Sequence, residues 1–203
     1  MLKRGQITVF IILIIVIAIS FGLIFYLKNL NAKSISGAAA APLNVNAVQF
    51  FVSGCLESVG KEGIFEVGKH GGYYLKPRSS TEINSYWIAN YYEKGVVLVP
   101  EREVLEHELE LYINANLGKC LDFSTFKDQG YVIKRGKTGS KVKILDDKIL
   151  LTLDCPLTVT LFSNQYRFET YSGEVAVRYG LAIDTARRIA EKIEAEPDYR
   201  DLT

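Results

Sequence analysis

The sequence predicts an α+β fold, in which a long N-terminal hydrophobic transmembrane helix precedes a globular head of about three helices and an antiparallel sheet. Three observations support this prediction. An uncharged and almost entirely apolar run extends from Ile7 to Leu27. Three later stretches repeat apolar residues at steps of three and four, which is typical of amphipathic helices. From Tyr131 to Tyr171, apolar and polar residues mostly alternate, which indicates strands.

The first element is the apolar run from Ile7 to Leu27. A helix of roughly 20 apolar residues fits the hydrocarbon core of a bilayer. A buried core helix is the alternative, but such helices are usually shorter and show a polar face. A cleaved secretory signal is also disfavoured, because Lys28-Asn29-Leu30 follows the run in place of small residues. We therefore expect the helix to be retained, with Lys3 and Arg4 holding the N-terminus in the cytoplasm and the head outside.

The residues in front of the run resemble a known processing signal. Lys3-Arg4-Gly5-Gln6, followed directly by a long hydrophobic helix, is similar to the N-terminus of an archaeal type IV prepilin. The resemblance implies that a prepilin peptidase cleaves between Gly5 and Gln6. It also implies that the mature chain polymerises into a cell-surface filament through its hydrophobic helix. The filament-core or membrane positions of that helix are then Ile7, Phe10, Ile14, Ile17, Phe21, Gly22 and Phe25.

The partners implied by this resemblance are further copies of the chain, the prepilin peptidase, the pilus assembly machinery, and membrane lipid before assembly. One position departs from the family pattern. Pilins often place a glutamate about five residues into the mature chain, and Phe10 occupies that position here. This departure favours an alternative function, that of a single-pass membrane-anchored domain which binds a partner or ligand outside the cytoplasm without polymerising.

The chain organisation follows from composition. The expected segments are a cytoplasmic leader (1–5), the hydrophobic helix (6–28), a linker or helix extension rich in small residues (29–42), the head (43–196) and a polar tail (197–203). The first 33 residues contain four basic residues and no acidic one, so the remainder has 20 basic and 23 acidic residues and a net charge of −3. A mildly acidic head argues against a nucleic-acid partner, which requires clustered basic surface.

Two predicted helices of the head each carry a cysteine. After Pro42, apolar residues recur at helical spacing and place Cys55 on the apolar face of a helix. This helix is expected either to end near Gly60 or to continue with breaks to Val67. A second helix begins after Pro100 and places Cys120 on its apolar face. Because the apolar faces of two helices in a small domain should pack together, we predict a Cys55–Cys120 disulfide and an unpaired Cys155. Three buried free thiols are the alternative.

The strands are predicted from alternation and turn residues. Glu93-Lys94-Gly95 marks one hairpin, and Asp146-Asp147 marks a second. Pro156 interrupts the alternation and indicates a bulge or an edge strand. A last helix is expected from about Glu174 to Glu194.

No motif in the sequence predicts catalysis, and we expect no enzyme activity, no cofactor and no metal. Arg135-Gly136-Lys137-Thr138 lacks the spacing of a phosphate-binding loop and is expected to be a basic turn. Glu103 and His107 are four residues apart, but a solvated acidic helix face explains them better than a metal site. A cluster of aromatic residues between Tyr73 and Tyr92 has two interpretations, strand packing and a subunit or adhesion surface.

Overall fold

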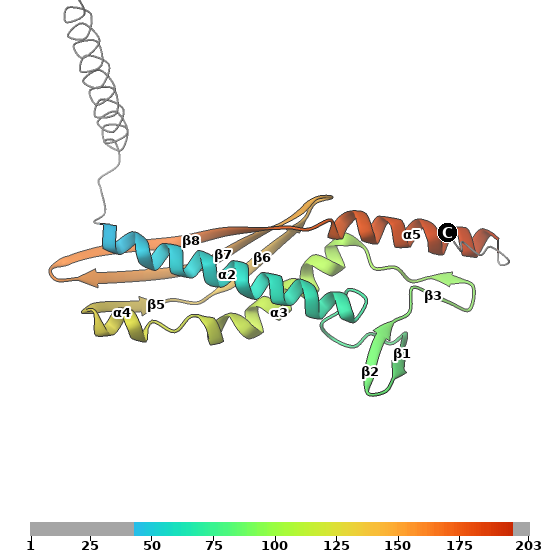
Figure 1. Cartoon of the computed structure of the whole chain (residues 1–203), viewed down its shortest axis with the longest axis horizontal. Helices are drawn as coiled ribbons and strands as arrows, with labels where there is room; N and C mark the ends of the chain where they lie inside the picture. Colours follow the sequence, from blue (N-terminus) through green and yellow to red (C-terminus); the bar gives the residue numbers. More distant parts are fainter. Residues whose placement is uncertain (1–42, 197–203) are drawn as a thin grey trace, which may run out of the picture. The chain divides into compact units, whose positions relative to one another are not determined.

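A computed structural model describes residues 43–196 (Figure 1). The chain divides into two compact units, Met1–Leu43 and Asn44–Thr203, and the described elements belong to the second apart from the first residue of α2. The helices are α2 (Leu43–Lys69), α3 (Arg102–Cys120), α4 (Ser124–Asp128) and α5 (Tyr179–Ala195). The strands are β1 (Ser80–Ile83), β2 (Tyr86–Ala89), β3 (Tyr92–Glu93), β4 (Val96–Val97), β5 (Tyr131–Arg135), β6 (Gly139–Ile144), β7 (Lys148–Leu161) and β8 (Asn164–Ala176).

The structure corrects the predicted fold class. Over residues 43–196, no helix is both long enough and apolar enough to cross a membrane. The longest of these helices, α2, carries five charged side chains along its length, namely Glu57, Lys61, Glu62, Glu66 and Lys69. This part of the chain is α+β as predicted, with three helices of 27, 19 and 17 residues and the five-residue α4, but its strands form three separate sheets in place of one. The predicted segments 1–5, 6–28, 29–42 and 197–203 lie outside the described residues.

The largest sheet is organised around β7. β8 pairs with β7 along nearly its whole length, and β6 and β5 pair with successive halves of its other side, all antiparallel. Buried side chains occupy every second position of β7, namely Ile149, Leu151, Leu153, Cys155, Leu157, Val159 and Leu161. The register between β7 and β8 shifts between Asp154 and Leu157. This irregularity confirms the predicted bulge, because Pro156 has no N–H to donate to a neighbouring strand.

Helix α2 packs on the buried face of this sheet and is longer than predicted. The helix passes Gly60 without a break and ends at Lys69. A Cβ atom at Gly60 would lie 2.3 Å from Leu151 Cδ1, so the glycine allows helix and sheet to approach closely. Gly63 does the same toward Tyr112 of α3, where the corresponding distance is 2.7 Å. Tertiary contact therefore explains two glycines that local propensity treats as helix breakers.

Helix α3 covers the outer edge of β6. The backbone N–H groups of Ile144, Val142 and Ser140 donate to side-chain oxygens of α3 at 2.8, 3.1 and 2.9 Å. The acceptors are Glu106, Glu110 and Asn114, in that order. The acceptors are four residues apart on α3, which is a rise of about 6.0 Å, and the donors are two residues apart on β6, which is a rise of about 6.8 Å. The spacing of acceptors along the helix therefore nearly equals the spacing of donors along the strand. We call these three acceptors the edge ladder.

The edge ladder corrects the prediction of a solvated acidic face on α3. Glu106 and Glu110 bind the strand edge, and the buried Glu108 accepts the N–H groups of Tyr74 and Leu75 at 2.8 and 3.0 Å. Of the glutamates at positions 103, 106, 108 and 110 of α3, only Glu103 is exposed and makes no such contact in the described structure. Glu106, Glu108 and Glu110 therefore satisfy backbone donors that would otherwise be unpaired.

The end of β8 and the start of α5 also differ from the prediction. Val175 lies in β8 opposite Ile149, and α5 starts at Tyr179 rather than near Glu174. The guanidinium of Arg102 holds the carboxylates of Asp184 in α5 and Asp146 in the β6–β7 turn. These ion pairs connect α5 to α3 and to the large sheet.

The ion pair at Asp184 predicts a pH dependence. A hydrogen bond from Arg102 lowers the pKa of Asp184 below the usual 3.8. A carboxylate with a lowered folded-state pKa stabilises the fold above its unfolded-state pKa, and this contribution is lost as the pH falls through the folded-state value. We expect Asp184→Asn to weaken the acid sensitivity of unfolding below about pH 4, measured as urea midpoints from pH 7 to pH 2. An unchanged pH profile would contradict this role.

Candidate functional site

The residues predicted for processing and for the filament core lie outside the described residues. These are Gly5, Gln6, Ile7, Phe10, Ile14, Ile17, Phe21, Gly22 and Phe25. The candidate site lies on the head, within residues 43–196.

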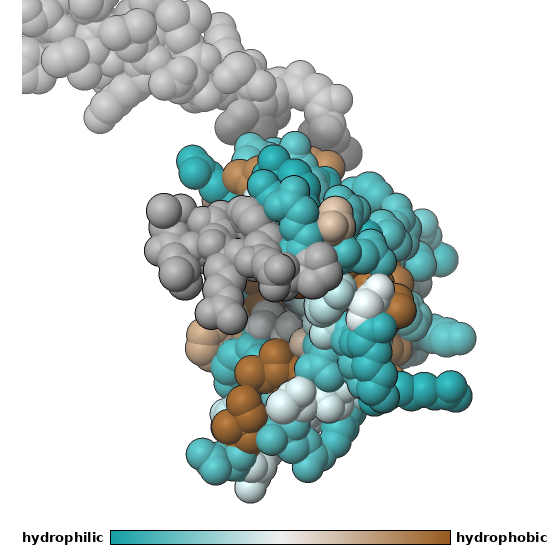
Figure 2. Space-filling model, turned by 90° about the vertical axis from the view of Figure 1, so that its right-hand side faces the viewer, coloured by the Kyte–Doolittle hydropathy of each residue, from teal (hydrophilic) through white to brown (hydrophobic). Residues whose placement is uncertain are grey.

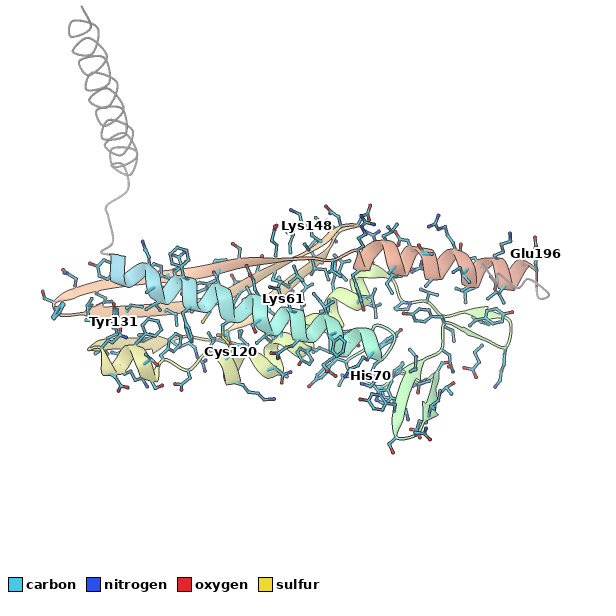
Figure 3. All side chains as sticks on the ribbon, in the orientation of Figure 1. Lys61, His70, Cys120, Tyr131, Lys148 and Glu196 are labelled. Atoms are coloured by element: carbon cyan, nitrogen blue, oxygen red, sulfur yellow. A yellow bond between two sulfur atoms is a disulfide. The ribbon has the colours of Figure 1, made fainter. Side chains whose placement is uncertain are left out.

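The predicted disulfide is confirmed. Cys55 of α2 and Cys120 at the end of α3 are bonded, with their Cα atoms 5.8 Å apart, which lies in the normal range. Figure 3 labels Cys120 where α3 passes beside α2. Both helices place their apolar residues toward the same interior, which is why periodicity alone selected this pair. The bond ties the helix that leads in from the N-terminal unit to the helix that covers the edge of β6.

Cys155 is the unpaired cysteine and is fully buried in β7. Burial raises the pKa of its thiol, an effect that nearby Arg135 only partly opposes. Since the thiolate is the reactive form, this thiol is expected to be inert in the folded protein.

Counting thiols with iodoacetamide at pH 8 tests both assignments. We expect no labelled cysteine in the folded protein, one after unfolding without reductant, and three after unfolding with reductant. Tryptic mass spectrometry should place the single label on Cys155. Labelling of Cys55 in the unfolded, unreduced chain would contradict the disulfide.

The hairpin formed by β1 and β2 projects from the end of α2 (Figure 1). Its two loop residues, Asn84 and Ser85, have φ angles of 49° and 69°. Positive φ at both positions is the geometry of a tight two-residue hairpin turn, and asparagine adopts it at low cost. Asn84-Ser85 is therefore the signal in the sequence that locates this hairpin, as Glu93-Lys94-Gly95 locates the hairpin of β3 and β4.

His70 connects the hairpin to α2. Its imidazole stacks on the Trp87 ring at a centroid distance of 4.1 Å, and its Nδ1 donates to the Trp87 carbonyl oxygen at 2.7 Å. The Ala89 N–H in turn donates to the His70 carbonyl oxygen at 3.2 Å. Figure 3 shows His70 at the end of α2, beside the hairpin. His70 is thus an anchoring residue, in addition to lying next to a glycine turn.

The outer side of the hairpin is apolar and exposed. Ile83, Tyr86 and Ile88 are 56%, 55% and 44% exposed, and Phe65 on the neighbouring face of α2 is 66% exposed. Lys69 lies over the Phe65 ring, with 4.8 Å between its Nζ and the ring centroid. We call these five residues the hairpin surface. Figure 2 shows hydrophobic side chains in the lower part of this end of the head, where the hairpin lies.

The aromatic cluster noted in the sequence is divided between packing and surface. Tyr91 points inward, where its hydroxyl donates to the Gly71 carbonyl oxygen at 3.1 Å and burial raises its pKa. Tyr74 packs edge-on against Tyr112, with ring centroids 5.4 Å apart. Tyr86, in contrast, is on the exposed hairpin surface. Packing therefore accounts for Tyr91 and Tyr74, whereas Tyr86 is exposed, and its role in a subunit or adhesion surface stays a prediction.

The other predicted chemical positions are separate from one another. Arg135 ends β5, and Gly136 donates its N–H to the Pro156 carbonyl oxygen at 2.8 Å, which fixes the crossing from β5 to β6. His107 is exposed on α3. Within residues 43–196, no three His, Cys, Asp or Glu side chains come close enough to hold a metal ion together.

Comparisons of this chain with protein-family models, with curated proteins and with solved structures found no match.

Proposed function

We propose that this chain is a structural subunit of a type IV pilus-like filament on the cell surface. The observation that carries the proposal is the sequence Lys3-Arg4-Gly5-Gln6 directly before an uncharged run of 21 residues, Ile7 to Leu27. The prepilin peptidase would cut between Gly5 and Gln6, and the pilus assembly machinery would add the subunit to the filament. Copies of the apolar segment would then pack together, which removes their apolar surface from water and from lipid.

Features of the head support a mechanical role outside the cytoplasm. The Cys55–Cys120 disulfide suits an oxidising environment. It crosslinks α2, which continues the chain from the N-terminal unit, to α3. The hairpin surface offers exposed aromatic and aliphatic side chains for a neighbouring subunit or for adhesion, since aromatic residues are enriched at protein interfaces. A filament contact, rather than catalysis, is the role we assign to it.

Sheared surface filaments test the proposal. We expect mass spectrometry of filaments from native cells to contain a peptide of this chain that begins at Gln6. In cells that carry Gly5→Ala, a change at the residue before the cut, processing and surface filaments should be lost while the chain remains in the membrane fraction. Filaments that lack the chain would refute the proposal.

A membrane-anchored binding domain is the second candidate, and Phe10 is the specific observation that favours it. A pilin often has a glutamate at that position, where it would partner the new N-terminal amine. Under this candidate the hairpin surface binds a partner outside the cytoplasm and the chain does not polymerise. It predicts an intact Met1 in membranes and a monomer or small complex in mild detergent. A Gln6 N-terminus together with detergent-resistant polymers would exclude it.

A further inference from the structure

The turn between β7 and β8 places an aromatic ring in solvent. Phe162 is the first of two loop residues, and it is 92% exposed, more than any other large hydrophobic residue among those described. Its backbone has a φ of 55°, in the left-handed region. Ser163, the second loop residue, is not among the described residues with positive φ. Positive φ at the first loop position alone is the geometry for which glycine is preferred.

This choice of residue works against folding stability. A bulky side chain with positive φ is strained, and strain of this kind persists where function requires it. The ring gains almost no burial in return, since nearly all of it is exposed. Two other two-residue turns also start with a non-glycine residue at positive φ, namely Asn84 between β1 and β2 and Lys94 between β3 and β4. In both of these turns the second loop residue has positive φ as well, and asparagine tolerates the conformation. Phe162 therefore needs an explanation outside the head itself.

The location of the turn indicates what it faces. Phe162 and Leu161 line a shallow pocket of about 220 Å³ together with Ala47, which is in the second turn of α2. The turn therefore lies at the same end of the head as the start of α2 (Figure 1). Helix α2 begins at Leu43, and only residues 28–42 separate it from the end of the apolar run at Leu27, so this end of the head is the one nearest in sequence to that run.

The chemistry of the turn matches a lipid surface. The stretch 155–166 contains no charged residue, although charged residues stand at both of its ends, Asp154 and Arg167. Val132, which pairs with Thr160 two positions from Phe162, is 56% exposed. Aromatic rings beside uncharged polar groups are favoured at the boundary between lipid headgroups and acyl chains.

We propose that the β7–β8 turn touches the membrane, with the Phe162 ring inserted at the boundary of headgroups and acyl chains. The proposal rests on the membrane location of the apolar segment, which both candidate functions share. The turn holds the head at a defined height and orientation on the bilayer before assembly, or permanently in an anchored protein. Ser163 and Asn164 supply polar groups at headgroup level.

Tryptophan quenching by brominated phosphatidylcholine tests the contact in the full chain. Trp87 is the one tryptophan of the protein, so the wild type gives the baseline. In vesicles, we expect Phe162→Trp to add emission that is shifted to the blue and is largely quenched by the brominated lipid. Ile83→Trp, on the exposed hairpin surface, should add emission that brominated lipid leaves unchanged. All three proteins are first shown to float with the vesicles.

The outcomes separate this inference from the proposed function. Flotation together with quenching confined to position 162 supports the contact. Flotation with equal quenching at positions 83 and 162 overturns it while leaving the membrane location intact. Emission at position 162 that shifts with protein concentration but not with brominated lipid also overturns it, and indicates a second copy as the partner. If the proteins do not float with the vesicles, the result refutes the membrane location of the apolar segment, and it refutes the contact of the turn as well.

Stability variants show whether Phe162 serves folding instead. We expect Phe162→Gly to shift the folding equilibrium about fivefold toward the folded state, because it relieves the positive φ. The control Ser163→Gly should shift it toward the unfolded state, because there glycine only adds freedom to the unfolded chain. Phe162→Gly should also weaken protection of the turn by lipid in hydrogen exchange. A destabilised Phe162→Gly would show that the ring contributes to folding and would overturn the argument from strain.

Discussion

Replacing Cys55 and Cys120 together by alanine is expected to lower the free energy of unfolding by about 4 kcal/mol. The disulfide joins residues 65 positions apart, so it removes many conformations from the unfolded chain. Such a loss is a large part of the stability of an ordinary domain. Urea unfolding followed by circular dichroism, with and without reductant, measures it.

Reductant supplies the matched control for this prediction. Wild-type protein in reductant should lose the same stability as the double variant, and the double variant should not respond to reductant. Cys155→Ala is a control for removing a buried sulfur atom without a crosslink, and its loss should be clearly smaller. A double variant within about 1 kcal/mol of wild type would mean that the crosslink does not restrict the unfolded chain.

Removing the edge ladder is expected to cost about 3 kcal/mol of stability and to cause self-association. The triple variant Glu106→Ala, Glu110→Ala and Asn114→Ala deletes three acceptors, each worth about 1 kcal/mol. It also uncovers the N–H groups along the edge of β6, and an open strand edge is a template for pairing with another chain. Urea unfolding and light scattering over a range of concentrations measure the two effects.

Hydrogen exchange gives the site-specific readout for the ladder. Protection should fall at the amides of Ser140, Val142 and Ile144, while the β7–β8 pairs keep theirs. Glu103→Ala, an exposed acid on the same helix, should change neither stability nor association. A double Gln variant at Glu106 and Glu110 retains the acceptor oxygens and should lose less than the alanine variant. Unchanged protection at the three amides in the triple variant would contradict the ladder.

The candidate site was only partly predictable from the sequence. The aromatic residues near Trp87 were recognisable as an outlier, but their division into inward and exposed side chains was not. Tyr91 points inward because the Gly71 carbonyl oxygen accepts its hydroxyl from 20 positions away. His70 anchors Trp87 across 17 positions. Contacts of this range leave no local pattern. Similarly, Phe162 is exposed because β7 and β8 pair up to Leu161 and Asn164 and leave it in the turn between them.

The sequence by itself determined the features that depend on near neighbours in the chain. Helical spacing placed Cys55 and Cys120 on apolar faces and so identified the disulfide. Turn residues located the hairpins at Glu93 to Val96 and at the β6–β7 turn, and Pro156 located the bulge. These features are decided by backbone dihedrals and by alternation, which a stretch of five to ten residues specifies.

Only the tertiary structure decided the features that depend on distant partners. Helix α2 continues past Gly60 because Leu151 fills the space that a side chain would occupy. The acids of α3 bind the edge of β6 because helix and strand repeats coincide over these residues. Strand β8 continues to Ala176 because Ile149 lies opposite Val175. In each case the free energy comes from packing or hydrogen bonding between residues more than 20 positions apart, which overrides local propensity.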